Sequence, residues 1–282
     1  MRKMTITAES VRRFLPKRDE NTHKGDYGRV LIIGGSVGFT GAPRLAANAA
    51  LHCGSGLIYV AVPDTVYSIV ASGLTEPMVF PFASDGNRLS FAALDALLER
   101  AEGCDACLIG IGMGLSEDTK RLTHELLRHL SVPTVLDADG INCLAGHIDV
   151  LRETACPVIL TPHDGEFARL GGNLSADRLN ETKRLADETG KVLLRKGHRT
   201  LIYEADRYYL NQTGNPGMAV GGSGDVLSGI ILSLLGQGLA PFDAACFGAW
   251  LHGAAGDLCA AEIGEYGMTP TDMIEAVPRL LK

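Results

Sequence analysis

Six short runs of apolar and β-branched residues recur along the chain, separated by longer polar or mixed segments. They cover residues 29–35, 57–62, 106–112, 133–139, 157–162 and 191–197. Because these runs are continuously apolar rather than alternating, they predict strands that are buried on both faces, as the strands of parallel sheets are.

Segments with helical patterns lie between most of these runs. The clearest are residues 42–54, 91–103, 117–130 and 175–190, which are amphipathic or rich in small residues. Strands and helices in alternation predict an α/β fold, in which helices cover both faces of a mostly parallel sheet. With 282 residues and 46% apolar content, the chain is long enough to bury a large core, and we expect one domain over residues 1–282.

The pattern changes after residue 199. "TLIYEADRYYLNQTG" (200–214) contains two short apolar runs around a polar turn, which predicts an antiparallel hairpin at one edge of the sheet. Three helices are expected to follow, over about 223–235, 242–261 and 270–281.

Charge and hydropathy exclude several classes of function. The formal net charge is −7 and the basic residues are scattered, so we expect no nucleic-acid partner. The first twenty residues lack the apolar core of a secretory signal. The most apolar stretch, residues 226–240, is interrupted and too short to cross a bilayer, so we expect no membrane association and a cytoplasmic protein.

The seven cysteines support the same compartment. They are spread over the whole chain without the dense spacing of a disulfide scaffold, which favours a reducing environment. Cys104 and Cys107 form a C-x-x-C pair, but no second pair follows at the spacing of a zinc site. Buried thiols are therefore favoured over metal ligands.

Ligands of open α/β sheets bind beyond the carboxyl ends of the strands. Glycines and polar residues gather at these ends, among them Asp137, Asp139, His163 and Lys196. The densest group is "AVGGSGDVLSG" (219–229), where three glycines precede or surround Asp225 at the expected start of a helix.

Asp225 has two interpretations. It could cap the helix, which is the usual role of an aspartate at such a position. However, a cap does not need the neighbouring glycines, which suit backbone N–H groups that hold a phosphate. Beside a bound phosphate, Asp225 would be a general base that takes the proton of an attacking hydroxyl.

Two further segments are weaker candidates. "GGSVGFTGAP" (34–43) lacks both the dinucleotide fingerprint and the Walker lysine, so a loop that approaches a ligand and an ordinary tight turn are equally favoured. His163 and Glu166 in "TPHDGEFARL" (161–170) suit a polar ligand, although Glu166 could simply stabilise the helix dipole. Lys196 suits a phosphate, although a lysine at a strand end is often only solvated.

Taken together, the motifs resemble a known family. "GGSVGFTGAP" (34–43), "TPHDGE" (161–166), "KGHRT" (196–200) and "GGSGDVLSGII" (221–231), in this order, resemble the ADP-dependent NAD(P)H-hydrate dehydratases of the ribokinase-like superfamily. The resemblance implies a repair reaction in which NADH or NADPH that has added water to its nicotinamide ring, in the S form, is restored. ADP is consumed and AMP and phosphate are released.

The resemblance also implies site residues. Ala42, Gly112, His163 and Asp225 would contact the hydrate, and Asp225 would be the base. Lys196, Gly197, His198, Arg199, Thr200, Gly222, Ser223 and Gly224 would bind the adenine nucleotide, and Mg²⁺ would assist. A separate epimerase is expected to convert the R hydrate, because only about 25 residues precede the first predicted strand.

Two other functions remain open. A ribokinase-like kinase of a vitamin precursor, of the hydroxymethylpyrimidine or hydroxyethylthiazole type, would use the same glycine loop and base. A nucleotide-binding module without activity is less favoured, because binding ADP does not need Asp225. The small-residue segment 243–261 would allow close helix packing, within one subunit or in a homo-oligomer.

Overall fold

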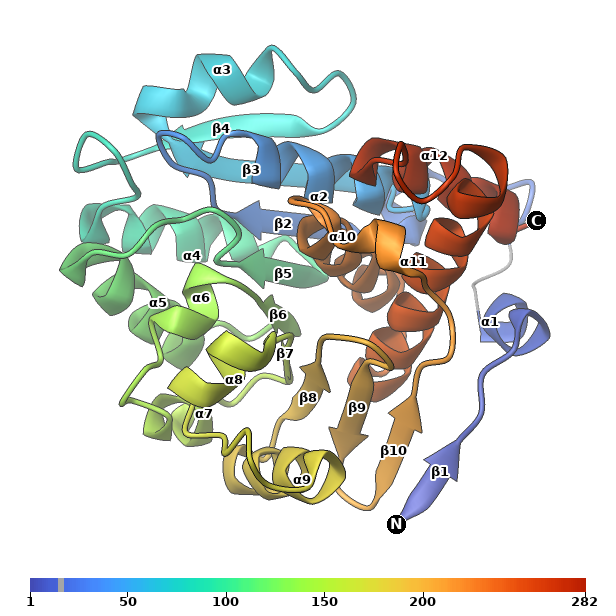
Figure 1. Ribbon diagram of the computed structural model, residues 1–282. Coiled ribbons are helices and arrows are strands. Elements are labelled where there is room, and N and C mark those ends of the chain that lie inside the picture. The colour runs from blue at the N-terminus through green and yellow to red at the C-terminus, as the bar shows by residue number, and fades with distance from the viewer. Residues whose placement is uncertain (15–17) are drawn as a thin grey trace.

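The apolar runs form neighbouring strands of one ten-stranded sheet in the computed structural model, which describes residues 1–14 and 18–282. The strand order is β1-β10-β9-β8-β7-β6-β5-β2-β3-β4 (Figure 1). The strands are β1 (Arg2–Met4), β2 (Arg29–Ile33), β3 (Leu57–Pro63), β4 (Met78–Phe82), β5 (Ala106–Ile109), β6 (Thr134–Leu136), β7 (Val158–Leu160), β8 (Val192–Arg195), β9 (Leu201–Glu204) and β10 (Arg207–Leu210). Within the described residues only β9 runs antiparallel to its neighbours, so the predicted mostly parallel sheet is confirmed.

Helices cover both faces of this sheet, as the alternating pattern predicts (Figure 1). They are α1 (Ala8–Phe14), α2 (Gly41–His52), α3 (Tyr67–Ala71), α4 (Leu94–Glu102), α5 (Glu117–His129), α6 (Asp139–Asn142), α7 (Asp149–Glu153), α8 (Asp164–Arg169), α9 (Arg178–Thr189), α10 (Ser223–Gly236), α11 (Pro241–Glu262) and α12 (Pro270–Leu280). The last three helices match the predicted ranges to within one or two residues.

Alternate residues of each central strand pack into different cores. Val30 and Ile32 of β2 pack with the cluster formed by α2, α10 and α11. Leu31 and Ile33 point to the opposite face, into the cluster formed by α4, α5, α7 and α9. Because both faces are covered, every position of such a strand must be apolar, which explains the continuous runs in the sequence.

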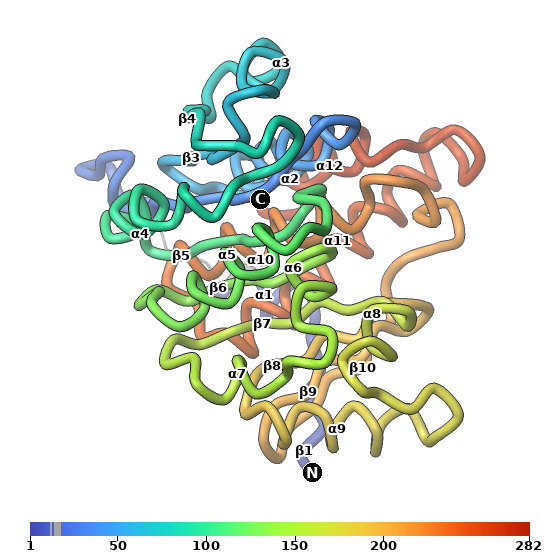
Figure 2. Tube along the Cα trace, turned by 90° about the vertical axis from the view of Figure 1, so that its left-hand side faces the viewer, coloured from blue at the N-terminus to red at the C-terminus, as the bar shows by residue number. Residues whose placement is uncertain are grey.

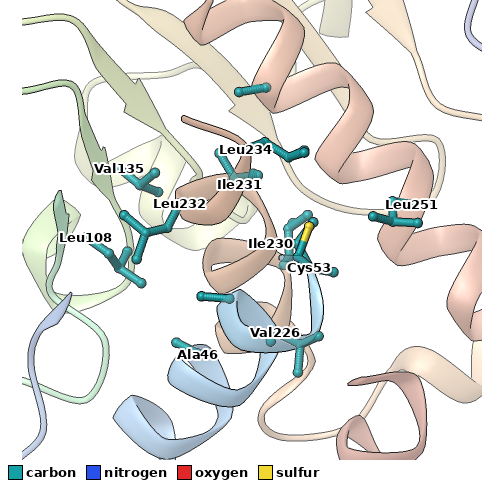
Figure 3. Packing of buried hydrophobic residues seen from close by; sticks show 14 of the residues in the cluster. Ala46, Cys53, Leu108, Val135, Val226, Ile230, Ile231, Leu232, Leu234 and Leu251 are labelled. Carbon is teal, nitrogen blue, oxygen red and sulfur yellow. The ribbon is translucent and has the colours of Figure 1, made fainter. Parts of the chain in front are cut away.

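Helix α10 lies in the middle of one core. Figure 3 shows Ile230 and Leu232 of α10 between the strands that carry Leu108 and Val135 and the neighbouring helices α2 and α11. Gly229 lets α10 approach α2 closely, since an added Cβ atom there would lie 2.3 Å from the carbonyl oxygen of Ala46. The packing therefore fixes the position of α10, including the first turn that carries Asp225.

The apolar runs in the sequence do not predict the two edge strands of the sheet. β9 and β10 form the expected hairpin, but β1 adds outside it in parallel, so β1 is the edge strand. At the opposite edge β4 pairs with β3, and the two edges lie at opposite ends of the molecule (Figure 2). Both edge strands lack a strong strand pattern: β1 is short and polar, and β4 contains Pro81, which a strand tolerates at an edge.

The cysteine and membrane predictions can be compared directly with the structure. All seven cysteines are free and buried, which confirms the expectation of buried thiols. Residues 1–14 and 18–282 include no helix that is both long enough and apolar enough to span a bilayer.

Candidate active site

The loop before α10 places Asp225 in the first turn of a buried helix. The cap position belongs to Gly222, which adopts a left-handed conformation with φ of 97°. A side chain there would collide with Leu45, because an added Cβ atom would lie 2.5 Å from the Leu45 Cδ1 atom. Asp225 is therefore not the cap residue. The N–H groups that open a helix lack partners inside it, and this end of α10 suits an anion.

The surroundings of Asp225 favour its protonated form. Burial raises the pKa of this carboxyl to about 7, the negative charge of Asp137 adds to the effect, and Lys196 opposes it. A carboxylate whose pKa lies near neutral pH is well matched to accept a proton from a substrate. Asp225 thus has the property that a general base needs and a helix cap does not.

Lys196 supplies the positive charge of the site. It follows β8, and its Nζ atom lies 2.7 Å from Asp137 Oδ1 and 3.7 Å from Glu166 Oε2. Burial alone would lower the pKa of Lys196, but the two carboxylates outweigh it and hold the pKa above its ordinary value. Lys196 is therefore a permanent cation. A Cβ atom added to Gly224 would lie 3.6 Å from its Nζ atom, so this cation lies beside the start of α10.

Asp137 is the buried partner of this cation. It follows β6, is only 1% exposed, and accepts hydrogen bonds from the Ala138 N–H group at 2.8 Å and the Ser228 hydroxyl at 2.6 Å. Burial would raise the pKa of Asp137, but Lys196 and the hydroxyl groups of Ser228 and Thr161 together hold it below its ordinary value. Asp137 therefore stays ionised inside the protein.

The segment "KGHRT" forms a tight loop between β8 and β9. Gly197 and Arg199 both have positive φ, at 135° and 55°. Arg178, at the start of α9, holds this loop: its guanidinium group donates hydrogen bonds to the carbonyl oxygens of His198 at 2.8 Å and of Arg195 and Lys196 at 3.2 Å each. One side chain distant in sequence thus fixes the backbone of the predicted nucleotide-binding loop.

A cavity of about 870 Å³ opens between this loop and α10. Most of the predicted nucleotide-binding residues line it together: Lys196, Gly197, His198, Arg199, Thr200, Ser223 and Gly224, with His163. The loop over 211–220 and the middle of α11 complete the wall, with Asn211, Thr213, Asn215 and His252 among the polar groups. Its volume falls within the range of cofactor sites, which is roughly 300–1,000 Å³.

His252 is a cavity residue that the sequence patterns do not indicate, because it lies inside an apolar helix. Its Nε2 atom is 3.3 Å from the Ser223 hydroxyl. Burial lowers the pKa of His252 to about 4, so the ring is neutral at neutral pH. It is a hydrogen-bonding group for Ser223 rather than an acid.

His163 and Glu166 form the N-terminus of α8. The His163 Nδ1 atom accepts hydrogen bonds from the N–H groups of Gly165 and Glu166, and the Glu166 carboxylate accepts one from the His163 N–H group at 2.9 Å. Glu166 is nevertheless more than a helix-dipole residue. It is buried, and its carboxylate also lies 3.2 Å from the Nε2 atom of His163 and 3.7 Å from the Nζ atom of Lys196, so α8 joins the charged cluster at the strand ends.

Ala42 and Gly112 meet at a second place on the strand ends. Gly112 has φ of 57°, and a Cβ atom added to it would lie 3.1 Å from the Ala42 Cβ atom and 2.8 Å from that of Phe39. The Ser36 hydroxyl donates a hydrogen bond to the Gly112 carbonyl oxygen at 2.8 Å. The structure therefore brings together two of the residues predicted to contact the hydrate, whereas His163 lies at the wall of the cavity.

Comparison with known proteins gives this geometry a family. A family model described as NAD(P)H-hydrate dehydratase matches residues 30–279. The chain belongs to the NAD(P)H-hydrate dehydratase family. An ADP-dependent (S)-NAD(P)H-hydrate dehydratase from Neisseria meningitidis is 38% identical over 93% of this chain and 88% of its own length. A bifunctional NAD(P)H-hydrate repair enzyme from Moorella thermoacetica is 48% identical over 98% of this chain and 53% of its own, so the chain spans about half the length of such relatives.

Solved structures place the family in the ribokinase-like fold. The ADP/ATP-dependent NAD(P)H-hydrate dehydratase from Bacillus subtilis, co-crystallised with ATP and Mg²⁺, has a TM-score of 0.81 and 30% identity, over 97% of this chain and 96% of that one. A hydroxyethylthiazole kinase from Pyrococcus horikoshii has a TM-score of 0.66 at 18% identity over 96% of this chain and 92% of that one, which shows a shared fold only.

The sequence motifs do not reveal which side chains contact the charged residues of the site. Asp137 is visible in the sequence as a polar residue after a strand, but its contacts with Lys196 and Ser228 are not. No cluster of three metal-binding side chains is present among residues 1–14 and 18–282.

Proposed function

We propose that this chain restores NADH and NADPH from their S hydrates, using ADP and releasing AMP and phosphate. The observation that carries the proposal is Asp225, a buried carboxyl with a pKa of about 7 in the first turn of α10, next to a cavity that the predicted nucleotide-binding residues line together. The names of the Neisseria and Bacillus relatives support the same substrates.

The chemistry follows from the positions of these groups. Asp225 takes the proton of the hydrate's hydroxyl group, whose oxygen attacks the terminal phosphorus of ADP, and AMP leaves. The N–H groups of Gly222, Gly224 and Asp225, together with the Lys196 ammonium group, stabilise the charge on the moving phosphoryl group. Mg²⁺, bound with the phosphates, would add to this neutralisation. The ring nitrogen's lone pair then expels phosphate, and loss of a ring proton regenerates the reduced nicotinamide.

We further propose the domain organisation, compartment and partners of the enzyme. Residues 1–282 act as one catalytic domain in the cytoplasm, where the buried thiols stay reduced. An epimerase supplies the S hydrate from the R form, which agrees with the word bifunctional in the names of the longer relatives. The small-residue helix α11 is compatible with a homo-oligomer, whose subunit number size-exclusion chromatography with light scattering would give.

The direct test is an assay with ADP and purified S hydrate, followed by the ultraviolet absorbance of the reduced nicotinamide ring. Absorbance should return with the S hydrate and ADP together, and should not return with the R hydrate or without ADP. A kinase of a vitamin precursor would instead leave the hydrate untouched and phosphorylate the small alcohol. Absence of turnover with the S hydrate under conditions where ADP binds would overturn the proposal.

A further inference from the structure

Three charged side chains from different parts of the sheet converge at the start of α10. Asp137 comes from the end of β6, Lys196 from the end of β8, and Asp225 from α10 itself. Asp137 and Lys196 form a hydrogen-bonded ion pair, whereas Asp225 interacts with both only through their charges. Lys196 therefore lies near two carboxylates and is bonded to one of them.

Both oxygen atoms of Asp137 accept hydrogen bonds inside the protein. Oδ1 accepts hydrogen bonds from the Ala138 N–H group and from the Lys196 ammonium, and Oδ2 accepts one from the Ser228 hydroxyl. At 1% exposure, Asp137 has no access to solvent that could replace these partners. This leaves the buried carboxylate in one orientation.

The bond to Ser228 connects Asp137 to the helix that carries the base. Ser228 is three residues after Asp225, so the two side chains project from the same face of α10. Asp137 thus holds both the ammonium group beside Asp225 and the turn of helix that follows Asp225. Asp137 therefore contacts both elements that determine where this cation lies relative to the base.

We infer that Asp137 is a positioning residue, which binds the Lys196 ammonium group and so keeps it from closing an ion pair with Asp225, leaving Asp225 free to accept the substrate proton. The inference rests on the proposed role of Asp225 as the base. An ammonium group has three donors. Engaged by Asp137, Lys196 still has donors for a phosphate, and the base is not neutralised before the substrate arrives.

The charges around Asp225 determine the direction of the expected effects. Asp137 is the carboxylate and Lys196 the cation that act on Asp225 directly. Glu166 of α8 and the neutral His252 of α11 face Lys196 from the other elements. Removing the negative charge of Asp137 makes Asp225 easier to ionise, and it also frees Lys196 to pair with Asp225. Both consequences lower the proton affinity of Asp225.

The test measures the titration of Asp225 in the free protein. Aspartate carboxyl groups labelled with carbon-13 are followed by NMR over pH, and the Asp225 signal is the one missing from Asp225→Asn. In Asp137→Asn the proton affinity of Asp225 should fall about tenfold or more, and in Lys196→Met it should rise. Ser228→Ala is the matched control, because it removes a bond to Asp137 without changing charge, and its Asp225 midpoint should stay close to that of the wild type.

Activity gives a second readout. Asp137→Asn should move the acidic limb of the pH dependence of kcat/KM, which reports the free enzyme, to lower pH and should lower the plateau, because a weaker base is less effective. An unchanged Asp225 midpoint in a folded Asp137→Asn protein that still binds ADP would overturn the inference. If that variant does not fold, an Asp225 midpoint that fails to rise in Lys196→Met would do so. Because the NMR titration needs no substrate, it separates this failure from failure of the proposed reaction.

Discussion

The start of α10 and the contact between Ala42 and Gly112 are built in different ways. Asp225 lies among side-chain charges, with the hydrogen-bonded Asp137 and Lys196 pair beside it. Ala42 and Gly112 instead form a close contact of small residues, with Gly112 in a conformation that disfavours a side chain. The first region is sensitive to charge and the second to volume.

The two regions are expected to contribute to catalysis and ligand binding in different ways. Charges that a protein holds in place can stabilise a transition state or bind a charged ligand, so changes to them alter turnover or nucleotide binding. Space that a protein leaves open mainly decides which ligand fits, and changes to it alter binding. Substitutions in the two regions should therefore differ in their effects on kcat, on the KM for ADP and on hydrate affinity.

The largest effect is expected for Asp225→Asn. The amide keeps the shape of the side chain but cannot take a proton, so kcat should fall at least ~100-fold, the lower end of the effect of a general base. ADP affinity, measured by calorimetry on the same preparation, should remain close to that of the wild type. Turnover like that of the wild type would show that Asp225 is not the base.

The wild-type enzyme should lose activity in acid. A base must be ionised to act, and the pKa of Asp225 is raised to about 7 in the free protein, so kcat/KM should fall as the pH drops through this value. Below it the loss should approach tenfold per pH unit. Initial rates at low substrate concentration between about pH 5 and pH 9 give the profile, with protein stability checked at each value. A kcat/KM that stays constant down to pH 5 would show that the base is ionised there, as an ordinary aspartate is.

Much of this site could be predicted from short motifs, whereas its internal bonds could not. The glycines before Asp225 and the segment at 196–200 are continuous in the sequence, and their residue types indicate an anion site. Asp137 bonds to Lys196 and Ser228, which are 59 and 91 positions away in the sequence. Only the folded sheet, with α10 packed against it, brings these residues together.

The same distinction applies to the fold. Central strands are predictable because burial on both faces requires continuous apolar residues, as in β2. β1 escapes such a prediction because it is short and polar and pairs with β10, which is far away in the sequence. β4 escapes it because Pro81 interrupts its apolar run. Arg178 is a similar case: its sequence position gives no sign that it holds the loop at 196–200.

Lys196→Ala should mainly affect nucleotide binding. Loss of a charged contact to phosphate should raise the KM for ADP about tenfold, which corresponds to about 1.4 kcal/mol, within the usual range for bonds to charged groups. Because loss of Lys196 should also raise the proton affinity of Asp225, the two proteins are best compared near pH 9 rather than at neutral pH. A fall in kcat with ADP affinity unchanged would assign Lys196 to the chemical step alone.

A smaller effect is expected for Ala42→Leu in the second region. The larger side chain should fill space near Gly112 and weaken hydrate binding by at least ~1 kcal/mol, the scale of mild overpacking, while ADP binding changes little. Ala42→Ser is the matched control, because it adds little volume. Calorimetric titration of each ligand decides the outcome: equal losses for both would indicate a damaged fold, and no loss for the hydrate would place the substrate elsewhere.

The central claim is that Asp225 drives phosphoryl transfer from ADP to a hydrate that then loses phosphate. The most direct measurement is the amount of each product formed in one reaction of the wild-type protein with ADP and the S hydrate of NADPH, separated by chromatography. The account predicts NADPH, AMP and phosphate in equal amounts, and none of them with Asp225→Asn beyond its small residual rate. NADPH formed without AMP, or AMP formed without NADPH, would contradict it.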